Sequence, residues 1–194
     1  MPDLFSNLLI IDPAVAMTCR LLLVLVFASA VRHKLVEPVA FRAVVGDYRL
    51  LPDSLVTVAA AGLVALECTA AITLLIPATA AFGAWIAFGL LLTYTLGITI
   101  NLARGRTNID CGCVGPARDP DTRGRKLSYW LLVRNLPLVL IALAAALPVD
   151  QRSLLVWDFA TIFFAVLSLG MLYTTVNHLL TNAPVLRALV ARHD

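Results

Sequence analysis

Apolar residues fill five long runs of this chain, and polar residues gather in the segments between the runs. About 20 apolar residues, rising about 1.5 Å each, are enough to cross a hydrocarbon core of about 30 Å. The predicted spans are residues 13–31, 54–76, 80–100, 127–147 and 154–176. Backbone polar groups in lipid must bond within their own segment, so the pattern predicts an all-α polytopic membrane bundle of four to five transmembrane helices. We expect an N-terminal tail at 1–12, the bundle at 13–176 and a C-terminal tail at 177–194, without a separate soluble domain.

Composition and charge agree with a membrane protein. Hydrophobic residues make up 60% of the chain and charged residues only 14%, which lies outside the range of soluble domains. The formal net charge is +3. The basic residues fall mostly in the connecting loops, as they do in membrane proteins, so the charge does not indicate a nucleic-acid partner.

The most distinctive chemistry lies in the polar loop 101–126, where Cys111 and Cys113 flank Gly112. A disulfide between them closes a very small ring, because their α-carbons lie near the upper limit of separation that a disulfide bridges. Gly112 permits the necessary bend, since it has no side chain to clash. Such a ring gains little from loop closure and is easily reduced. The pattern therefore predicts Cys111 and Cys113 as catalytic thiols of disulfide exchange.

Charged neighbours modify the reactivity of these thiols. Arg104 and Arg106 favour the thiolate form, whereas the carboxylate of Asp110 opposes it. The spacing of these residues does not indicate which cysteine attacks first.

Two charged residues lie inside the predicted spans at similar depth. Arg20 is in the first span and Glu67 in the second, antiparallel one. Because an unpaired charge in lipid is costly, we expect an intramembrane ion pair between them. Such a pair holds two helices in register, or it serves a proton path or a polar headgroup. Arg134 and Asp158 are a weaker second pair, because their depths match poorly.

Cys19 and Cys68 also lie at comparable depths in the first two spans. Buried thiols usually act as small, inert packing residues. The alternative is a secondary thiol pair that relays electrons, which requires both sulfurs to face each other.

Several motifs together carry a family resemblance between about Pro13 and Leu147. They are Arg20 and Lys34 in and after the first span, Tyr48-Arg49-Leu50-Leu51-Pro52, Glu67, Arg104-Gly105-Arg106, Asp110-Cys111-Gly112-Cys113, Leu127-Ser128 and Arg134-Asn135. With them the chain resembles the MauE family of methylamine utilisation membrane proteins, which is related to the DoxX-like redox-associated group.

The resemblance implies a helper of the bacterial inner membrane. It would support disulfide formation, processing or transport of a periplasmic client, the methylamine dehydrogenase small (beta) subunit, together with a membrane-anchored thioredoxin-like partner. The Cys-x-Cys pair of the family maps onto Cys111 and Cys113, and the DoxX-like Arg and Glu map onto Arg20 and Glu67. Cys19 and Cys68 are not part of the family pattern, and no cofactor is implied.

Two other functions remain open from the residues. Cys111, Cys113 and Asp110, with His33 or His178, are the ligand types of a zinc or copper site, although only two thiolates cluster, so we expect no metal. Alternatively the chain is a noncatalytic assembly or transport factor whose Cys-Gly-Cys forms a tight turn.

The sidedness of the thiols is ambiguous. With five spans, most arginines lie on the same side as Cys111 and Cys113, and the opposite loops hold only Arg152. The positive-inside rule then places the thiols in the cytoplasm, whereas stable disulfides belong in the periplasm.

Overall fold

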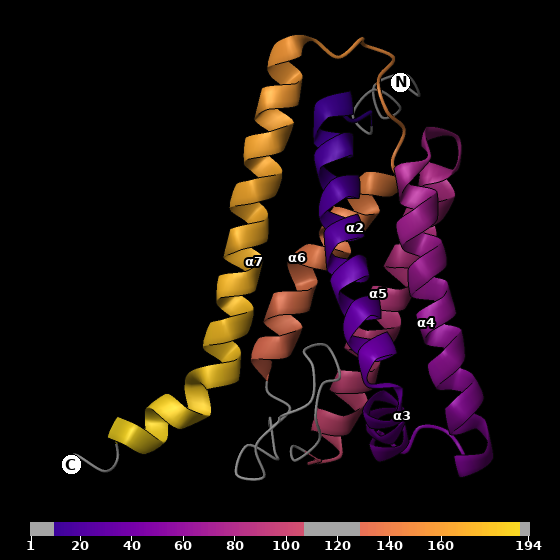
Figure 1. Ribbon diagram of the computed structural model, residues 1–194, viewed down its shortest axis with the longest axis vertical. Coiled ribbons are helices and arrows are strands. Elements are labelled where there is room, and N and C mark those ends of the chain that lie inside the picture. The colour runs from indigo at the N-terminus through magenta and orange to yellow at the C-terminus, as the bar shows by residue number, and fades with distance from the viewer. Residues whose placement is uncertain (1–9, 107–128, 191–194) are drawn as a thin grey trace, which may run out of the picture.

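The computed structural model describes residues 10–106 and 129–190, with side chains as far as residue 179. This part of the chain is a bundle of helices (Figure 1). Five of its helical segments are long and apolar enough to cross a membrane, which confirms the predicted fold class. The helices are α2 (Pro13–Val36), α3 (Pro38–Asp47), α4 (Asp53–Leu75), α5 (Ala80–Ala103), α6 (Tyr129–Ala146) and α7 (Val156–Val190), with a 3-10 turn at Pro77–Thr79.

Two segments are more helical than the sequence pattern suggested. The region after the first predicted span was expected to be a polar loop, but α2 continues to Val36 and α3 covers Pro38–Asp47. Pro38 occupies the first turn of α3, where its missing N–H is not needed. The residues from 177, expected as a C-terminal tail, continue α7 as far as Val190.

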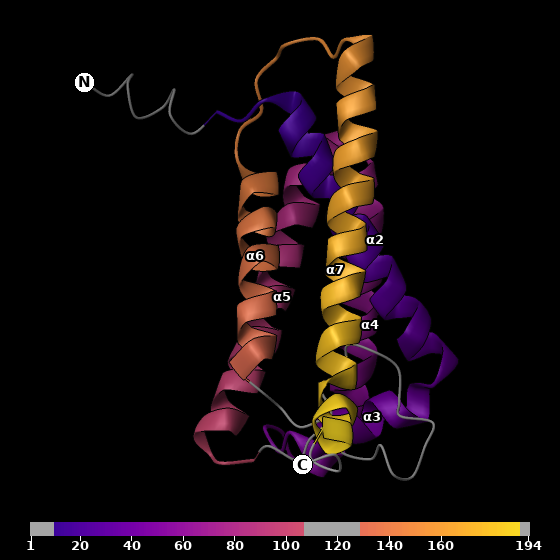
Figure 2. The same cartoon turned by 90° about the vertical axis from the view of Figure 1, so that its left-hand side faces the viewer.

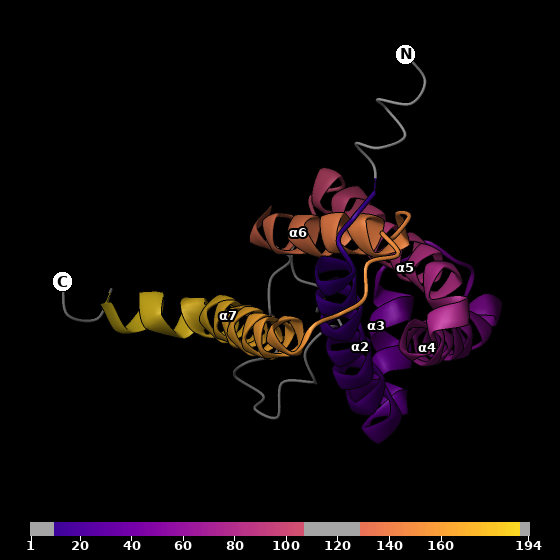
Figure 3. The same ribbon diagram turned by 90° about the horizontal axis from the view of Figure 1, so that it is seen from above.

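Helix α2 lies at the centre of the bundle and packs against α4, α6 and α7 (Figure 3). Helix α5 packs against α4 and α6. Helix α7 stands apart from α5 and α6 and packs mainly on α2 (Figure 2). Its only buried side chain among residues 156–179 is Ile162.

Small residues bring α4 and α5 close together. A Cβ atom added to Gly83 would lie 2.8 Å from the backbone nitrogen of Leu74, a separation that side chains do not tolerate. Gly97 also faces a neighbour, the ring of Tyr48, whereas a Cβ at Gly89 would meet nothing within 4 Å. Glycine is therefore needed for close approach at Gly83 but not at Gly89.

The bundle has two distinct ends. Helices α2 and α5 finish, and α4 and α6 begin, at the end from which residues 107–128 leave (Figure 1). We call it the thiol end, because Cys111 and Cys113 belong to that segment. At the opposite end a short bridge joins Ile11 to Val149, with N–H to O distances of 2.9 Å from Ile11 to Pro148 and from Asp150 to Ile11.

Candidate functional site

The predicted thiol site lies outside the described residues: Asp110, Cys111, Gly112 and Cys113 all fall in segment 107–128. The structure does define where this segment starts. Helix α5 ends in a Schellman motif, in which Arg106 N–H bonds to Asn101 O at 2.9 Å and Gly105 N–H bonds to Leu102 O at 3.0 Å. Gly105 has φ +70°, the left-handed conformation that this motif requires. The Arg104-Gly105-Arg106 motif therefore stops α5 and places two arginines at the thiol end.

A buried polar cluster lies inside the bundle. The ammonium nitrogen Nζ of Lys34 lies 2.5 Å from Oε1 of Glu67 and donates a second bond, of 3.2 Å, to Oη of Tyr94. Tyr94 Oη in turn donates to the same Glu67 oxygen at 2.7 Å. Lys34 retains 6% of its exposure and Glu67 1%. Helices α2, α4 and α5 each contribute one member of this Lys34–Glu67–Tyr94 cluster.

Aromatic rings complete the surroundings of the lysine. Nζ of Lys34 lies 4.5 Å from the ring centroid of Phe41, on α3, and 4.9 Å from that of Tyr94. Both distances are within the range of favourable cation–π contacts. The ammonium group is thus stabilised by a carboxylate, a phenol and two ring faces.

Helical periodicity explains why these side chains face inward. On α2, the buried residues Leu23 and Phe27 are one helical turn apart, and Lys34 follows Phe27 by two turns. On α4, Glu67 lies seven residues after the buried Ala60 and three before the buried Ala70, spacings that keep all three on one helix face. The spacing of the buried stripe was therefore present in the sequence, although the predicted first span ended at residue 31 and left Lys34 outside it.

The ion pair expected between Arg20 and Glu67 is not formed in the structure. Glu67 bonds to Lys34 and Tyr94 instead, and Nε of Arg20 is buried without a hydrogen-bond partner. The prediction matched depth along the membrane normal only. It did not account for the direction in which α2 turns each side chain, or for the length of the lysine side chain, which reaches inward from the last turn of the helix.

Cys19 and Cys68 are both free thiols. Cys19 is buried in the apolar core with Leu23, Phe27 and Leu74, and Cys68 is half-buried. Cys19 therefore has the surroundings of a packing residue.

A second polar cluster links α6 to α7. Arg134 is buried and donates to Oδ1 of Asn135 at 3.0 Å and to Oδ1 of Asn177 at 2.8 Å. Asp158, the partner suggested for Arg134 by the sequence, bonds to Arg152 instead. Near the end of α5, Asn101 is also fully buried, and its Oδ1 has no hydrogen-bond partner.

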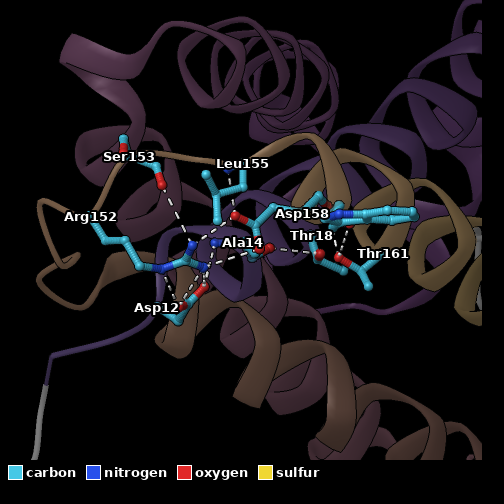
Figure 4. A network of polar contacts seen from close by, with 9 residues as sticks. Asp12, Ala14, Thr18, Arg152, Ser153, Leu155, Asp158 and Thr161 are labelled. Atoms are coloured by element: carbon cyan, nitrogen blue, oxygen red, sulfur yellow. Dashed lines mark hydrogen bonds and ion pairs between the residues drawn. The ribbon is translucent and has the colours of Figure 1, made fainter.

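Arg152 clamps two acids, Asp12 and Asp158 (Figure 4). Its guanidinium group lies 2.9 Å from Oδ2 of Asp12 and 2.7 Å from Oδ2 of Asp158. Asp12 also caps α2 by accepting a 2.8 Å bond from Ala14 N–H. The Ala14 N–H and the Arg152 side chain hold the pKa of Asp12 below its usual value, and the two acids raise the pKa of Arg152.

The histidines considered as metal ligands, His33 and His178, are both exposed. Within residues 10–106 and 129–179, no three His, Cys, Asp or Glu side chains gather in a metal-binding arrangement. The cysteines of the suggested metal site lie outside these ranges.

Comparison with known proteins identifies similar chains. The family model described as "Methylamine utilisation protein MauE" matches residues 12–148. The chain is 35% identical over 167 residues to the methylamine utilization protein MauE of Methylophilus methylotrophus, covering 86% of each chain. It is 41% identical over 147 residues to the protein of the same name from Methylorubrum extorquens, covering 75% of this chain and 76% of the relative. No solved structure matches the chain.

Proposed function

The chain belongs to the methylamine utilisation protein MauE family, and from this premise we propose that it is a thiol–disulfide exchange protein of the bacterial inner membrane. Its reactive groups are Cys111 and Cys113. Its client is a periplasmic protein rich in disulfides, the methylamine dehydrogenase small subunit, and its partner is a membrane-anchored thioredoxin-like protein.

The observation that carries this proposal is the Cys-Gly-Cys motif, placed in a polar segment between two membrane helices. Cys111 is five residues beyond Arg106, so the chain between them reaches at most about 18 Å. The chain length therefore keeps the pair near the thiol end of the bundle. This location suits exchange with a partner docked at the membrane surface.

The proposed exchange has two steps. One thiolate of the pair attacks a sulfur of the partner's disulfide, the partner's S–S bond breaks, and a mixed disulfide forms. The second cysteine, as its thiolate, then attacks its neighbour's sulfur in that mixed disulfide. The partner leaves as a dithiol, having gained two electrons, and Cys111 and Cys113 are left oxidised as a disulfide. The same steps in reverse return the oxidation to another protein.

Arg104 and Arg106 support the thiolate in this scheme. Arg104 is exposed and Arg106 is half-buried at the end of α5. A positive charge near a thiol favours its ionised form, which is the nucleophile. The negative charge of Asp110 opposes ionisation of the thiols, so it lowers the fraction of the pair that is present as thiolate.

Trapping experiments test the exchange reaction. In a Cys19→Ser, Cys68→Ser background, Cys111→Ser and Cys113→Ser should each abolish client maturation. One of the two should accumulate a mixed disulfide that a reductant releases. Normal maturation in both variants would instead indicate a noncatalytic assembly factor, and stoichiometric zinc or copper lost in both variants would indicate a metal site.

Labelling of intact spheroplasts with a membrane-impermeant thiol reagent determines the sidedness. Labelling from outside that requires prior reduction would mean an oxidised periplasmic pair. Protection until lysis would mean a cytoplasmic pair, in agreement with the exposed arginines Arg32, Arg42, Arg49 and Arg104 at the thiol end.

A further inference from the structure

The hydrogen bonds of Glu67 are distributed unevenly between its two oxygens. Lys34 Nζ and Tyr94 Oη both bond to Oε1. Oε2 is equally enclosed but accepts no hydrogen bond. A buried carboxylate oxygen without a donor is unfavourable in its charged form. Oε2 is therefore the oxygen of Glu67 whose charge no donor stabilises.

The chemistry of the three side chains permits proton movement between them. An ammonium group and a phenol both donate protons, and a carboxylate accepts one. Away from the ends of the spans, the other charged side chains of the described residues are Arg20 and Arg134. A guanidinium group does not give up its proton in proteins. The Lys34–Glu67–Tyr94 cluster is thus the charged cluster within the described spans that is able to change its protonation.

The cluster also leads inward from the thiol end. Lys34 belongs to the last turn of α2. Glu67 lies fourteen residues beyond the start of α4, which is about 21 Å along the helix. The ammonium group of Lys34 lies 2.5 Å from this carboxylate and is therefore buried at a similar depth.

We propose that Lys34, Glu67 and Tyr94 form a proton-exchange site inside the membrane, with Glu67 as the proton acceptor. The Lys34 ammonium group gives one proton to the Glu67 carboxylate, which leaves a neutral amine and a neutral carboxyl group. The amine then takes a proton from water. The site ends with one proton more than before, and the reverse sequence releases it.

The groups that surround Glu67 define what sets its protonation. Lys34 from α2 and Tyr94 from α5 are bonded to it directly. Helix α3 contributes the Phe41 ring beside Lys34, while its charged residues Arg42 and Asp47 are exposed. This proposal goes beyond the proposed thiol exchange, because proton uptake here does not require Cys111 or Cys113.

Infrared difference spectroscopy tests the proposal on the full-length protein in lipid nanodiscs. Between about pH 5 and 8, the range most relevant to proton exchange in cells, a carbonyl band of a protonated carboxyl group should appear as the pH falls. The band should be lost in Glu67→Gln. It should persist in Asp53→Asn, a matched control because Asp53 is an exposed acid on the same helix. The absence of any Glu67-dependent band in the folded protein would overturn the proposal.

A neutral double variant guards against misfolding of the Glu67→Gln variant. Glu67→Gln alone leaves Lys34 without its carboxylate, so it is combined with Lys34→Met to remove both charges. The double variant should fold and lack the band. Cys111→Ser with Cys113→Ser should retain the band, so failure of the thiol proposal would leave this result unchanged.

Discussion

The ammonium group of Lys34 and the carboxylate of Glu67 lie 2.5 Å apart and join α2 to α4 in the interior of the bundle. Removing one partner leaves the other as an uncompensated buried charge. We expect Lys34→Met to lower the free energy of unfolding by about 3–5 kcal/mol. Denaturant unfolding in detergent micelles, followed by circular dichroism, measures this change.

Two controls accompany that variant. Arg32→Met removes an exposed cation from the same turn of α2 and should change stability little. The double variant Lys34→Met, Glu67→Gln should lose less stability than Lys34→Met alone. Equal losses of stability in the single and double variants would show that an uncompensated Glu67 charge is not the cause of the loss in Lys34→Met.

Tyr94→Phe removes a hydroxyl that bonds to both Lys34 and Glu67. We expect a loss of about 1–3 kcal/mol in the free energy of unfolding, because the buried charges lose a shared partner. Tyr129→Phe is the matched control, since Tyr129 is exposed at the start of α6. The same unfolding measurement applies, and similar losses for both tyrosines would contradict the assigned role.

Gly83→Ala should separate α4 from α5, because the new Cβ would collide with the backbone of Leu74. We expect a loss of about 1–3 kcal/mol, which is typical of overpacking. Gly89→Ala, on the same helix, adds a methyl group where nothing lies within 4 Å. It should be neutral or stabilising, since alanine favours a helix more than glycine does. Thermal melting of both variants in micelles compares them directly.

The Arg152 clamp should give acid-dependent stability. The pKa of Asp12 is lower in the folded protein than the ordinary value of 3.8, chiefly through Ala14 N–H and then through Arg152. A lowered folded-state pKa contributes stability that is present above 3.8 and is lost as the pH falls through the folded-state value. Arg152→Gln should therefore lower the melting temperature at neutral pH, and its difference from the original protein should shrink in acid. If the difference in melting temperature between the two proteins stayed the same from neutral pH to below pH 3.8, the role assigned to the Asp12–Arg152 pair would be contradicted.

The sequence was sufficient to predict the helices that cross the membrane, because apolar length is a direct consequence of bilayer thickness. It was not sufficient for α3, a ten-residue helix with no buried residue and therefore no strong apolar pattern. It also identified Glu67 as a paired charge but assigned it the wrong partner. Depth can be read along a sequence, whereas the rotation of α2 that turns Lys34 inward depends on how neighbouring helices pack.

A closer reading of periodicity would have found Lys34. Phe27 and Lys34 are seven residues apart on the buried stripe of α2, a spacing that returns to the same helix face after two turns. Tyr94 similarly lies between the buried residues Leu91 and Ile98 of α5. By contrast, the bond between Arg134 and Asn177 joins two different helices. The periodicity of a single helix does not predict such a contact.

The peripheral position of α7 bears on how the protein is made. The part shared with the family model ends at residue 148, before α7 begins. On a ribosome, α2 to α6 emerge first, and among the described side chains they contain nearly all of the buried ones. Helix α7 therefore docks last, mainly against the surface of α2 that the earlier helices leave uncovered.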